Sequence, residues 1–201
     1  MKLYYAPGAC SISPHIVAEE AGIPLELEKV DLREHKTQTG EDYYKINPKG
    51  YVPALELDDG NILTEGPAIV QYLADQKPAS NLAPPNGTIG RYRLTEWLTF
   101  INSELHKSFS PLFGNGSDEA NNEAKAKIAK RFAYVDSILA KHHYLLGNTF
   151  SVADAYLFVI TNWATAMKIE LPTHLASFRK RVLARPKVQA ALIAEGLPIP
   201  S

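Results

Sequence analysis

Residues 52–73 read VPALELDDGNILTEGPAIVQYL, and this stretch decides the fold. Its first half has apolar runs on both sides of a Gly-containing turn at residues 58–61, which predicts a β-hairpin with strands at 52–57 and 62–64. Its second half repeats apolar residues at helical spacing after Pro67, a residue favoured at the first helical position. The stretch therefore predicts two antiparallel strands followed by a helix.

The residues before this stretch alternate strand and helix signals. Apolar runs at residues 2–5 and 25–30 flank a helical segment at 14–21, for which Ser13 is the expected N-cap. A short helix is expected near residues 41–46. The N-terminal order is then βαβ-α-ββα, which is an α+β domain.

The residues after the stretch carry helical signals alone. Residues 77–90 are rich in Pro, Gly, Asn and Ser and show no apolar period, so a linker is expected there. The helices expected beyond it span residues 91–113, 122–142, 152–167 and 175–183. The third of these opens with a capping-box variant, Ser151 and Asp154, and is expected to be the buried central helix. The sequence predicts an α+β domain at 1–80, a linker at 81–90 and an all-α helical bundle at 91–201.

Composition limits the function classes. The 201 residues are 45% apolar and carry a net charge of −1, so the chain can bury a sizeable core but has no basic field for nucleic acid. No segment approaches the roughly 18 apolar residues of a membrane span, and the N-terminus has no signal-peptide run, so a cytoplasmic protein is expected. With one cysteine and no Cys/His cluster of zinc spacing, neither an internal disulfide nor a metal is expected.

The single cysteine, Cys10, lies between the first strand and the first helix. A helix N-terminus favours thiolate and lowers the pKa of a nearby thiol, which would suit catalysis. A lone cysteine can equally be a small buried hydrophobe, and the pattern leaves both readings open. Because Ser13 stands where the second cysteine of a C-x-x-C pair would be, any disulfide of Cys10 needs an external thiol.

Two further positions suit an extended peptide. Pro53 begins a strand and, if cis, would turn the main chain of Val52 outward to pair with a peptide; an ordinary trans proline at a strand edge is the alternative. Glu65 and Gly66 open a helix whose free N–H groups would bind a ligand carboxylate, while Glu65 accepts from a ligand ammonium. The alternative there is a capped helix with a solvated glutamate.

The helix expected at residues 91–113 has a polar face that includes Thr99, Ser103 and His106. A polar face is usually only solvated. If this helix borders a cleft, however, His106 and Lys107 would point at an anionic thiol.

Together these features resemble a bacterial glutathione transferase of the beta class along essentially the whole chain. The resemblance is carried by residues 1–5 with 7–11, 47–50 with 52–55, 63–69, 104–107 and 151–156. It implies a glutathione transferase fold, with a thioredoxin-like N-terminal domain and an all-helical C-terminal domain. It also implies a homodimer with one glutathione site per subunit.

The same resemblance implies a set of site residues, with Cys10 and His106 as the catalytic pair. The glutathione-binding residues expected from it are Cys10, His35, Lys36, Tyr51, Val52, Pro53, Glu65, Gly66, Thr99, Ser103, Glu104 and His106, with Pro53 in the cis form. Ser103 and Glu104 are expected toward the partner subunit's ligand, and Tyr5, Lys107 and Trp163 around the electrophile. Relatives tend to carry lysine, glutamine and asparagine where this chain has His35, Tyr51 and Thr99, and Lys36 is a candidate to replace that lysine.

Three functions follow as hypotheses. The first is conjugation of reduced glutathione to hydrophobic electrophiles, a detoxification reaction. The second is a glutathione-dependent disulfide reductase or peroxidase that uses Cys10 through a mixed disulfide. The third is a non-catalytic binding protein, because this fold also serves as a protein-binding scaffold.

Overall fold

A computed structural model describes residues 1–114 and 116–199. The chain forms two compact units, Met1–Ala83 together with the segment from Leu183, and Pro84–Val182. The sequence placed all of residues 91–201 in one helical domain, whereas the structure groups the C-terminal segment with the N-terminal unit because its helix packs on the first helix of the chain. The expected end of the helical domain, at residue 201, lies outside the described residues.

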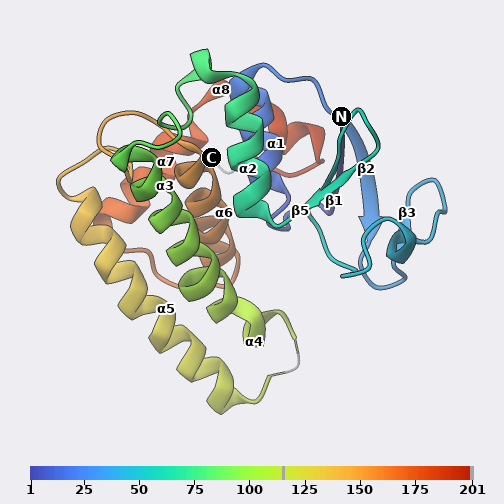
Figure 1. Cartoon of the computed structure of the whole chain (residues 1–201). Coiled ribbons are helices and arrows are strands. Elements are labelled where there is room, and N and C mark those ends of the chain that lie inside the picture. The colour runs from blue at the N-terminus through green and yellow to red at the C-terminus, as the bar shows by residue number, and fades with distance from the viewer. Residues whose placement is uncertain (115, 200–201) are drawn as a thin grey trace. The chain divides into compact units, whose positions relative to one another are not determined.

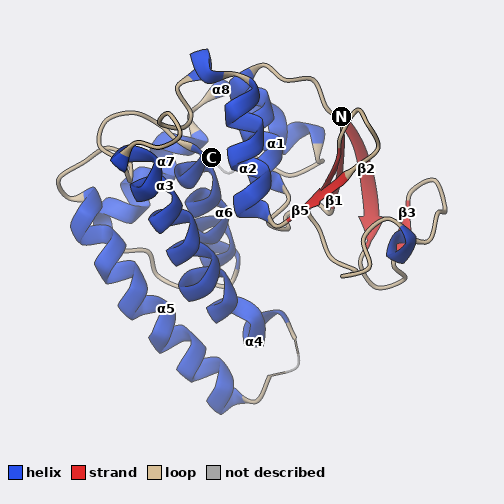
Figure 2. Ribbon diagram, viewed as in Figure 1, coloured by secondary structure: helices blue, strands red, loops and turns tan. Residues whose placement is uncertain are grey.

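The first unit is built on a five-stranded mixed sheet in the order β3-β2-β1-β4-β5 (Figure 2). The strands are β1 (Lys2–Tyr5), β2 (Glu26–Asp31), β3 (Lys36–Thr37), β4 (Ala54–Glu56) and β5 (Ile62–Thr64). β1 and β2 are parallel, and every other neighbouring pair is antiparallel. The predicted βαβ unit and hairpin are confirmed, although β4 is shorter than expected and β3 was not predicted.

Three helices of the first unit pack together, with α1 against both α2 and α8 (Figure 1). The unit's helices and 3₁₀ turns are α1 (Ile12–Ala21), η1 (Tyr43–Lys45), α2 (Gly66–Gln76), η2 (Pro78–Ser80) and α8 (Pro186–Ala194). Ser13 as N-cap of α1 is wrong, because the helix begins at Ile12 and Ser11 takes the cap position. The helix ends at Ala21, as predicted, because Gly22 caps it: Gly22 has φ 66°, and its N–H donates to carbonyls of the last turn.

A separate small core gathers around Tyr43 on η1. The Tyr43 ring is fully buried and contacts the ring of Tyr4, and the buried residues Val30, Val52 and Ala54 belong to the same cluster. This packing anchors the loop that follows η1 close to the start of β4. The start of β4 is where the sequence predicts a peptide-binding main chain.

The second unit is all helical within the described residues. Its elements are α3 (Ile89–Phe100), a π-helical turn η3 (Ile101–Leu105), a 3₁₀ turn η4 (His106–Phe109), α4 (Ser110–Phe113), α5 (Asp118–Leu139), α6 (Val152–Ala166) and α7 (Thr173–Leu183). The single helix expected at 91–113 is therefore wrong. It breaks where the helical winding changes, and Pro111, which lacks an N–H, stands at the start of the new helix α4. A π-helical turn inside a helix is a frequent feature of functional sites.

Helix α6 is the buried centre of this unit, as predicted. The Asp154 carboxylate accepts from the N–H of Ser151 at 2.9 Å, from the Ser151 hydroxyl at 2.7 Å and from the N–H of Leu145 at 2.9 Å. Asp154 is fully buried, and desolvation raises the pKa of its carboxyl to about 6. None of the helices in the described parts of the chain has the length and apolar character that crossing a membrane requires.

Candidate functional site

Cys10 lies in the loop between β1 and α1, two residues before the helix begins. Ser11 holds this loop: its hydroxyl donates to the Ala6 carbonyl at 3.2 Å and accepts from the Ala6 N–H at 3.2 Å. The Cys10 thiol is half-buried and donates to the main-chain carbonyl of Val52 at 3.4 Å. The structure thus brings together two predicted positions that lie 42 residues apart in the sequence.

The corner at Val52 is rigidly built. The Val52-Pro53 peptide bond is cis, as the resemblance implied. The carbonyl of the preceding residue, Tyr51, accepts from the Asn47 side-chain amide at 2.7 Å and from the Tyr43 hydroxyl at 3.2 Å. Both Val52 and Pro53 are buried, so their main chain is held in place by packing as well as by hydrogen bonds.

Glu65 takes the N-cap position of α2, and Gly66 is the first residue of the helix. Its φ of 71° is unusual for a residue with a Cβ and suggests a site where the surroundings dictate the backbone. The Glu65 carbonyl accepts from the N–H groups of Ala68 and Ile69 at 2.9 and 3.0 Å. Glu65 therefore begins the helix with its main chain and is half-exposed through its side chain.

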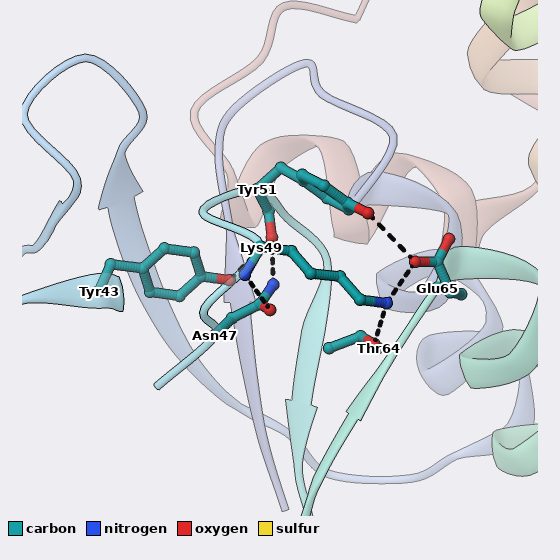
Figure 3. A network of polar contacts seen from close by, with 6 residues as sticks. All are labelled: Tyr43, Asn47, Lys49, Tyr51, Thr64 and Glu65. Carbon is teal, nitrogen blue, oxygen red and sulfur yellow. Dashed lines mark hydrogen bonds and ion pairs between the residues drawn. The ribbon is translucent and has the colours of Figure 1, made fainter. Parts of the chain in front are cut away.

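The Glu65 carboxylate is held by two residues from the loop before β4, as Figure 3 shows. The Lys49 ammonium donates to Oε1 of Glu65 at 2.6 Å and to the Thr64 hydroxyl at 2.9 Å, and the Tyr51 hydroxyl donates to the same Oε1 at 3.3 Å. The hydrogen bond and charge of Glu65 raise the pKa of Lys49. Lys49 was missed as a site residue, and the only signal for it was its place in the Asn47–Gly50 turn.

His35 and Lys36 lie at the start of β3. His35 has φ 51°, its Nδ1 lies 3.1 Å from the Gly50 carbonyl, and its ring lies 4.4 Å from that of Tyr44. Lys36 is exposed, with its ammonium 3.7 Å from the Glu34 carboxylate. His35 is thus fastened to the loop that carries Lys49, whereas Lys36 extends into solvent.

Tyr5 ends β1 and is buried. Burial raises the pKa of its hydroxyl, and the charge of Glu195, from the end of α8, adds to the shift. Tyr5 therefore stays protonated at neutral pH and can act as a hydrogen-bond donor.

In the second unit, His106 begins η4 directly after the π-helical turn. Its Nδ1 lies 2.5 Å from the Tyr156 hydroxyl oxygen, and that hydroxyl donates to the Asn102 side-chain carbonyl at 2.9 Å. A phenol has one proton, and because Tyr156 gives it to Asn102, Nδ1 of His106 must be the donor. In the neutral ring, Nε2 is then the acceptor nitrogen.

An aromatic cluster surrounds the His106 ring. Trp163 lies edge-on to it at 4.8 Å, and Phe113 and Phe109 lie 4.8 and 5.7 Å from Trp163. Phe113 is 54% exposed although it is apolar. Lys107, next along the chain, is exposed. Phe113 therefore exposes an apolar surface in the cluster beside His106, while Trp163 is 8% exposed and Phe109 is fully buried. The sequence analysis identified only Trp163 among the three.

The remaining predicted residues of the second unit are engaged locally. The hydroxyls of Thr99 and Ser103 are exposed and donate to carbonyls one helical turn back, at 2.8 and 2.9 Å. The Glu104 carboxylate accepts from the Arg131 guanidinium at 2.6 and 2.9 Å. Their roles toward glutathione stay predictions, as does the proximity of His106 to Cys10, because these two residues belong to different units.

The structure thus supplies two constellations. Cys10, Val52, Tyr51 and Glu65 are linked within the first unit, and His106, Tyr156 and Trp163 within the second. Over residues 1–114 and 116–199, His, Cys, Asp and Glu side chains form no group of three that could hold a metal ion.

Comparison with known proteins gives matches along nearly the whole chain. A family model described as "Glutathione S-transferase, N-terminal domain" matches residues 9–76, and one described as "Glutathione S-transferase, C-terminal domain" matches residues 96–186. Glutathione S-transferase GstA of Escherichia coli O157:H7 is 48% identical over 200 residues, covering 98% of this chain and 100% of that protein.

Solved structures agree with the family models. The chain is similar to a sphingomonad glutathione S-transferase complexed with glutathione, with a TM-score of 0.93, 47% identity and coverage of 98% and 100% of the two chains. It is similar also to the bacterial beta class glutathione S-transferase of Sphingomonas chungbukensis, with a TM-score of 0.93, 45% identity and the same coverage.

Proposed function

The chain belongs to the bacterial beta-class glutathione S-transferase family, and we propose that it conjugates reduced glutathione to small hydrophobic electrophiles. The observation that supports this most is the 3.4 Å hydrogen bond from Cys10 Sγ to the Val52 carbonyl. It puts the chain's one thiol beside the main chain on which a peptide would pair as an added strand. A peptide whose cysteinyl residue paired there would have its sulfur close to Cys10.

The proposed binding mode assigns each part of glutathione to a described feature. The cysteinyl part pairs with Val52 ahead of Pro53, and the γ-glutamyl end binds at Glu65 and Gly66 on the N-terminus of α2. The glycyl carboxylate binds near His35 or Lys36. Tyr51 borders the γ-glutamyl end through its bond to Glu65, and Thr99, Ser103 and Glu104 of the second unit complete the proposed set.

In the proposed reaction the glutathione thiol loses its proton and the sulfur forms a bond to an electrophilic carbon. A halide leaves from that carbon, or the C–O bond of an epoxide opens and the oxygen takes up a proton. Nε2 of His106 is suited to accept the thiol proton or its hydrogen bond, because Tyr156 fixes the tautomer in which this nitrogen is the acceptor. Phe113, and the exposed edge of Trp163, offer an apolar surface for the electrophile, with Phe109 packed beneath them. Tyr5 and Lys107 are the polar candidates beside it.

The proposal predicts that glutathione raises the melting temperature of the purified protein, as a ligand of the native state must. It also predicts glutathione-dependent product from at least one member of a panel of halogenated nitrobenzenes and epoxides. Absence of both effects would overturn it. A shift in melting temperature without conjugation would favour the binding-protein hypothesis instead.

A second candidate reaction is reduction of disulfides, favoured by the half-exposed thiol of Cys10. The Cys10 thiolate would attack a glutathione mixed disulfide, forming a Cys10–glutathione disulfide and releasing the other thiol. A second glutathione thiolate would then attack that disulfide, releasing oxidised glutathione and restoring Cys10. Mass spectrometry would detect the intermediate as an adduct of glutathione mass on Cys10.

Three further properties belong to the proposal. A homodimer with one site per subunit follows from the resemblance, and light scattering after size exclusion measures the mass that tests it. Detoxification follows if the electrophiles are foreign compounds. Reduced glutathione is the thiol of reducing compartments, so the proposed reaction suits the cytoplasm.

A further inference from the structure

Lys49 is a charged residue at the site to which the conjugation chemistry assigns no role. Its ammonium lies 2.6 Å from Oε1 of Glu65. That carboxylate is the group proposed to accept the α-ammonium of the γ-glutamyl end. The Lys49 ammonium therefore occupies the position on Glu65 at which the ligand's α-ammonium is proposed to bind (Figure 3).

The loop that carries Lys49 is fixed, so the ion pair is built into the fold. The Lys49 N–H donates to the Asn47 side-chain carbonyl at 3.1 Å, and the Asn47 amide group donates to the Tyr51 carbonyl at 2.7 Å. Gly50 closes the turn with φ 74° and its N–H 2.9 Å from the Asn47 carbonyl. The backbone of Lys49 thus lies where its side chain reaches both Thr64 and Glu65.

The ion pair itself is exchangeable. The side chains of Lys49 and Glu65 are 44% and 48% exposed. Exposed pairs of this kind contribute little to stability, and a lysine side chain has four rotatable carbons through which its ammonium can swing away. The contact is therefore weak enough for a ligand to replace.

We propose that Lys49 is the internal counter-ion of Glu65 and that it lowers the affinity of the site for the α-ammonium of the γ-glutamyl group. That ammonium must either displace Lys49 from Glu65 or bind beside it. This inference rests on the proposed glutathione function. An ammonium that takes Oε1 has to replace Lys49 there. One that binds the other carboxylate oxygen meets the like charge of Lys49 on the same carboxylate, which also opposes binding.

The pair has a second effect on the empty site. Without Lys49, the Glu65 carboxylate would lose its charged partner at a helix start whose backbone is already unusual, with φ 71° at Glu65. Lys49 and Tyr51 together keep Oε1 in the position where a ligand ammonium would find it. The site is thus ordered before binding, at the expense of some affinity for the amino group.

The test compares two ligands and four proteins by isothermal titration. The ligands are glutathione and glutaryl-cysteinyl-glycine, which keeps the α-carboxylate but lacks the α-amino group. The proteins are the wild type, Lys49→Met, Lys49→Arg and Lys45→Met. Lys45 lies in η1, four residues before Lys49, and is exposed, so its replacement removes one positive charge without removing the cation from Glu65.

For Lys49→Met we expect the Kd of glutathione to fall about twofold to fivefold, the range of an exposed ion pair, while the Kd of the glutaryl analogue does not fall. Lys49→Arg and Lys45→Met should keep the wild-type ratio of the two Kd values. Equal weakening of both ligands in Lys49→Met would mean that Lys49 binds a ligand carboxylate. Unchanged Kd values for both ligands would mean that Lys49 is a spectator. Either result overturns the inference. A wild type that binds neither ligand overturns the proposed function instead.

Discussion

Nδ1 of His15 lies 3.0 Å from Oε1 of Glu195, and 180 residues of chain separate the two. Both side chains are at least 95% buried, since 4% of His15 and 5% of Glu195 is exposed. Glu195 also accepts from the N–H of Gly8, two residues before Cys10. Burial raises the pKa of Glu195, and its hydrogen bond to His15 opposes that shift. The pair connects the end of α8 to both α1 and the loop that carries the thiol.

Removing this carboxylate should destabilise the protein strongly. Glu195→Ala leaves a buried histidine and the N–H of Gly8 without this acceptor, and each buried polar group left unsatisfied costs about 1–3 kcal/mol. Glu19→Ala is the matched control, because Glu19 and Lys187 join the same two helices through an exposed pair 3.3 Å long. We expect the control to change the free energy of unfolding by less than about 1 kcal/mol. Urea unfolding curves of both variants test this, and equal effects would contradict it.

Replacing Cys10 with alanine should separate the two enzymatic hypotheses. Conjugation uses the sulfur of glutathione, so Cys10→Ala should keep glutathione-dependent conjugation within about tenfold of wild type. Reduction of mixed disulfides needs the Cys10 sulfur as nucleophile, so that activity should be lost. Cys10→Ser, which is similar in shape and keeps a donor, now an O–H, toward the Val52 carbonyl, is the control for packing. Loss of both activities in both variants would show that the thiol itself acts in conjugation.

The hydroxyl of Tyr156 should matter to catalysis through His106. Tyr156→Phe removes the acceptor that keeps the proton on Nδ1, so the ring can turn or change tautomer. We expect kcat of conjugation to fall about tenfold with a smaller change in KM, together with a shifted pH profile. Asn102→Ala should show the same pattern more weakly, because it leaves the Tyr156 hydroxyl in place. If Tyr156→Phe lowered the free energy of unfolding but left the pH profile of conjugation unchanged, Tyr156 would have only a packing role.

Stability should depend on pH through Asp154. Its pKa is raised to about 6 in the folded state from an ordinary value of 3.8. The folded state therefore binds this proton more tightly than the unfolded state, and the stability contributed below about pH 4 is lost as pH rises through about 6. The loss amounts to roughly 3 kcal/mol at about 1.4 kcal/mol per pKa unit. Asp154→Asn should lack this loss, so between pH 4.5 and 7.5 the free energy of unfolding, measured in urea, should fall more in the wild type than in the variant.

Gly50 should tolerate no side chain. It has φ 74°, and a Cβ built there would lie 2.6 Å from the ring of Tyr44. Gly40 has φ 91° but open space around a built Cβ, so Gly40→Ala measures the backbone cost alone. We expect about 1 kcal/mol of destabilisation for Gly40→Ala and clearly more for Gly50→Ala. Glutathione binding should be weaker in Gly50→Ala because this turn leads into Val52, on whose main chain the peptide is proposed to pair. Thermal unfolding and titration check both, and equal effects would mean that Tyr44 moves aside.

Elements with strong local signals were predictable from the sequence. The hairpin and the start of α2 in residues 52–73 have turn residues, a proline and apolar periodicity that act over short distances. β3 was not predicted, because its two residues, Lys36 and Thr37, become a strand only by pairing with β2. The break of the helix after Phe100 was not predicted, because the apolar period continues across the π-helical turn.

The site was predictable where a residue type alone limits the chemistry. Cys10, Glu65 and His106 stood out as a thiol, a helix-start carboxylate and a histidine on a polar face. Lys49 and Tyr156 could not be predicted as site residues, because their roles depend on contacts between distant positions. Lys49 contacts Glu65, 16 residues away, and Tyr156 contacts His106, 50 residues away. Such contacts depend on tertiary packing, which periodicity does not describe.

The N-terminal unit is discontinuous in sequence, and this affects how it is made. At a synthesis rate of about 5–20 residues per second, the ribosome takes roughly 9 to 36 seconds to proceed from His15 to Glu195, 180 residues later. During that time the sheet and α1 exist without α8, and the imidazole and the Cys10 loop have no carboxylate to hold them. The first residues to leave the ribosome are therefore among the last to reach their final arrangement, and a nascent-chain pulse with a thiol reagent should find Cys10 more reactive before α8 emerges than after.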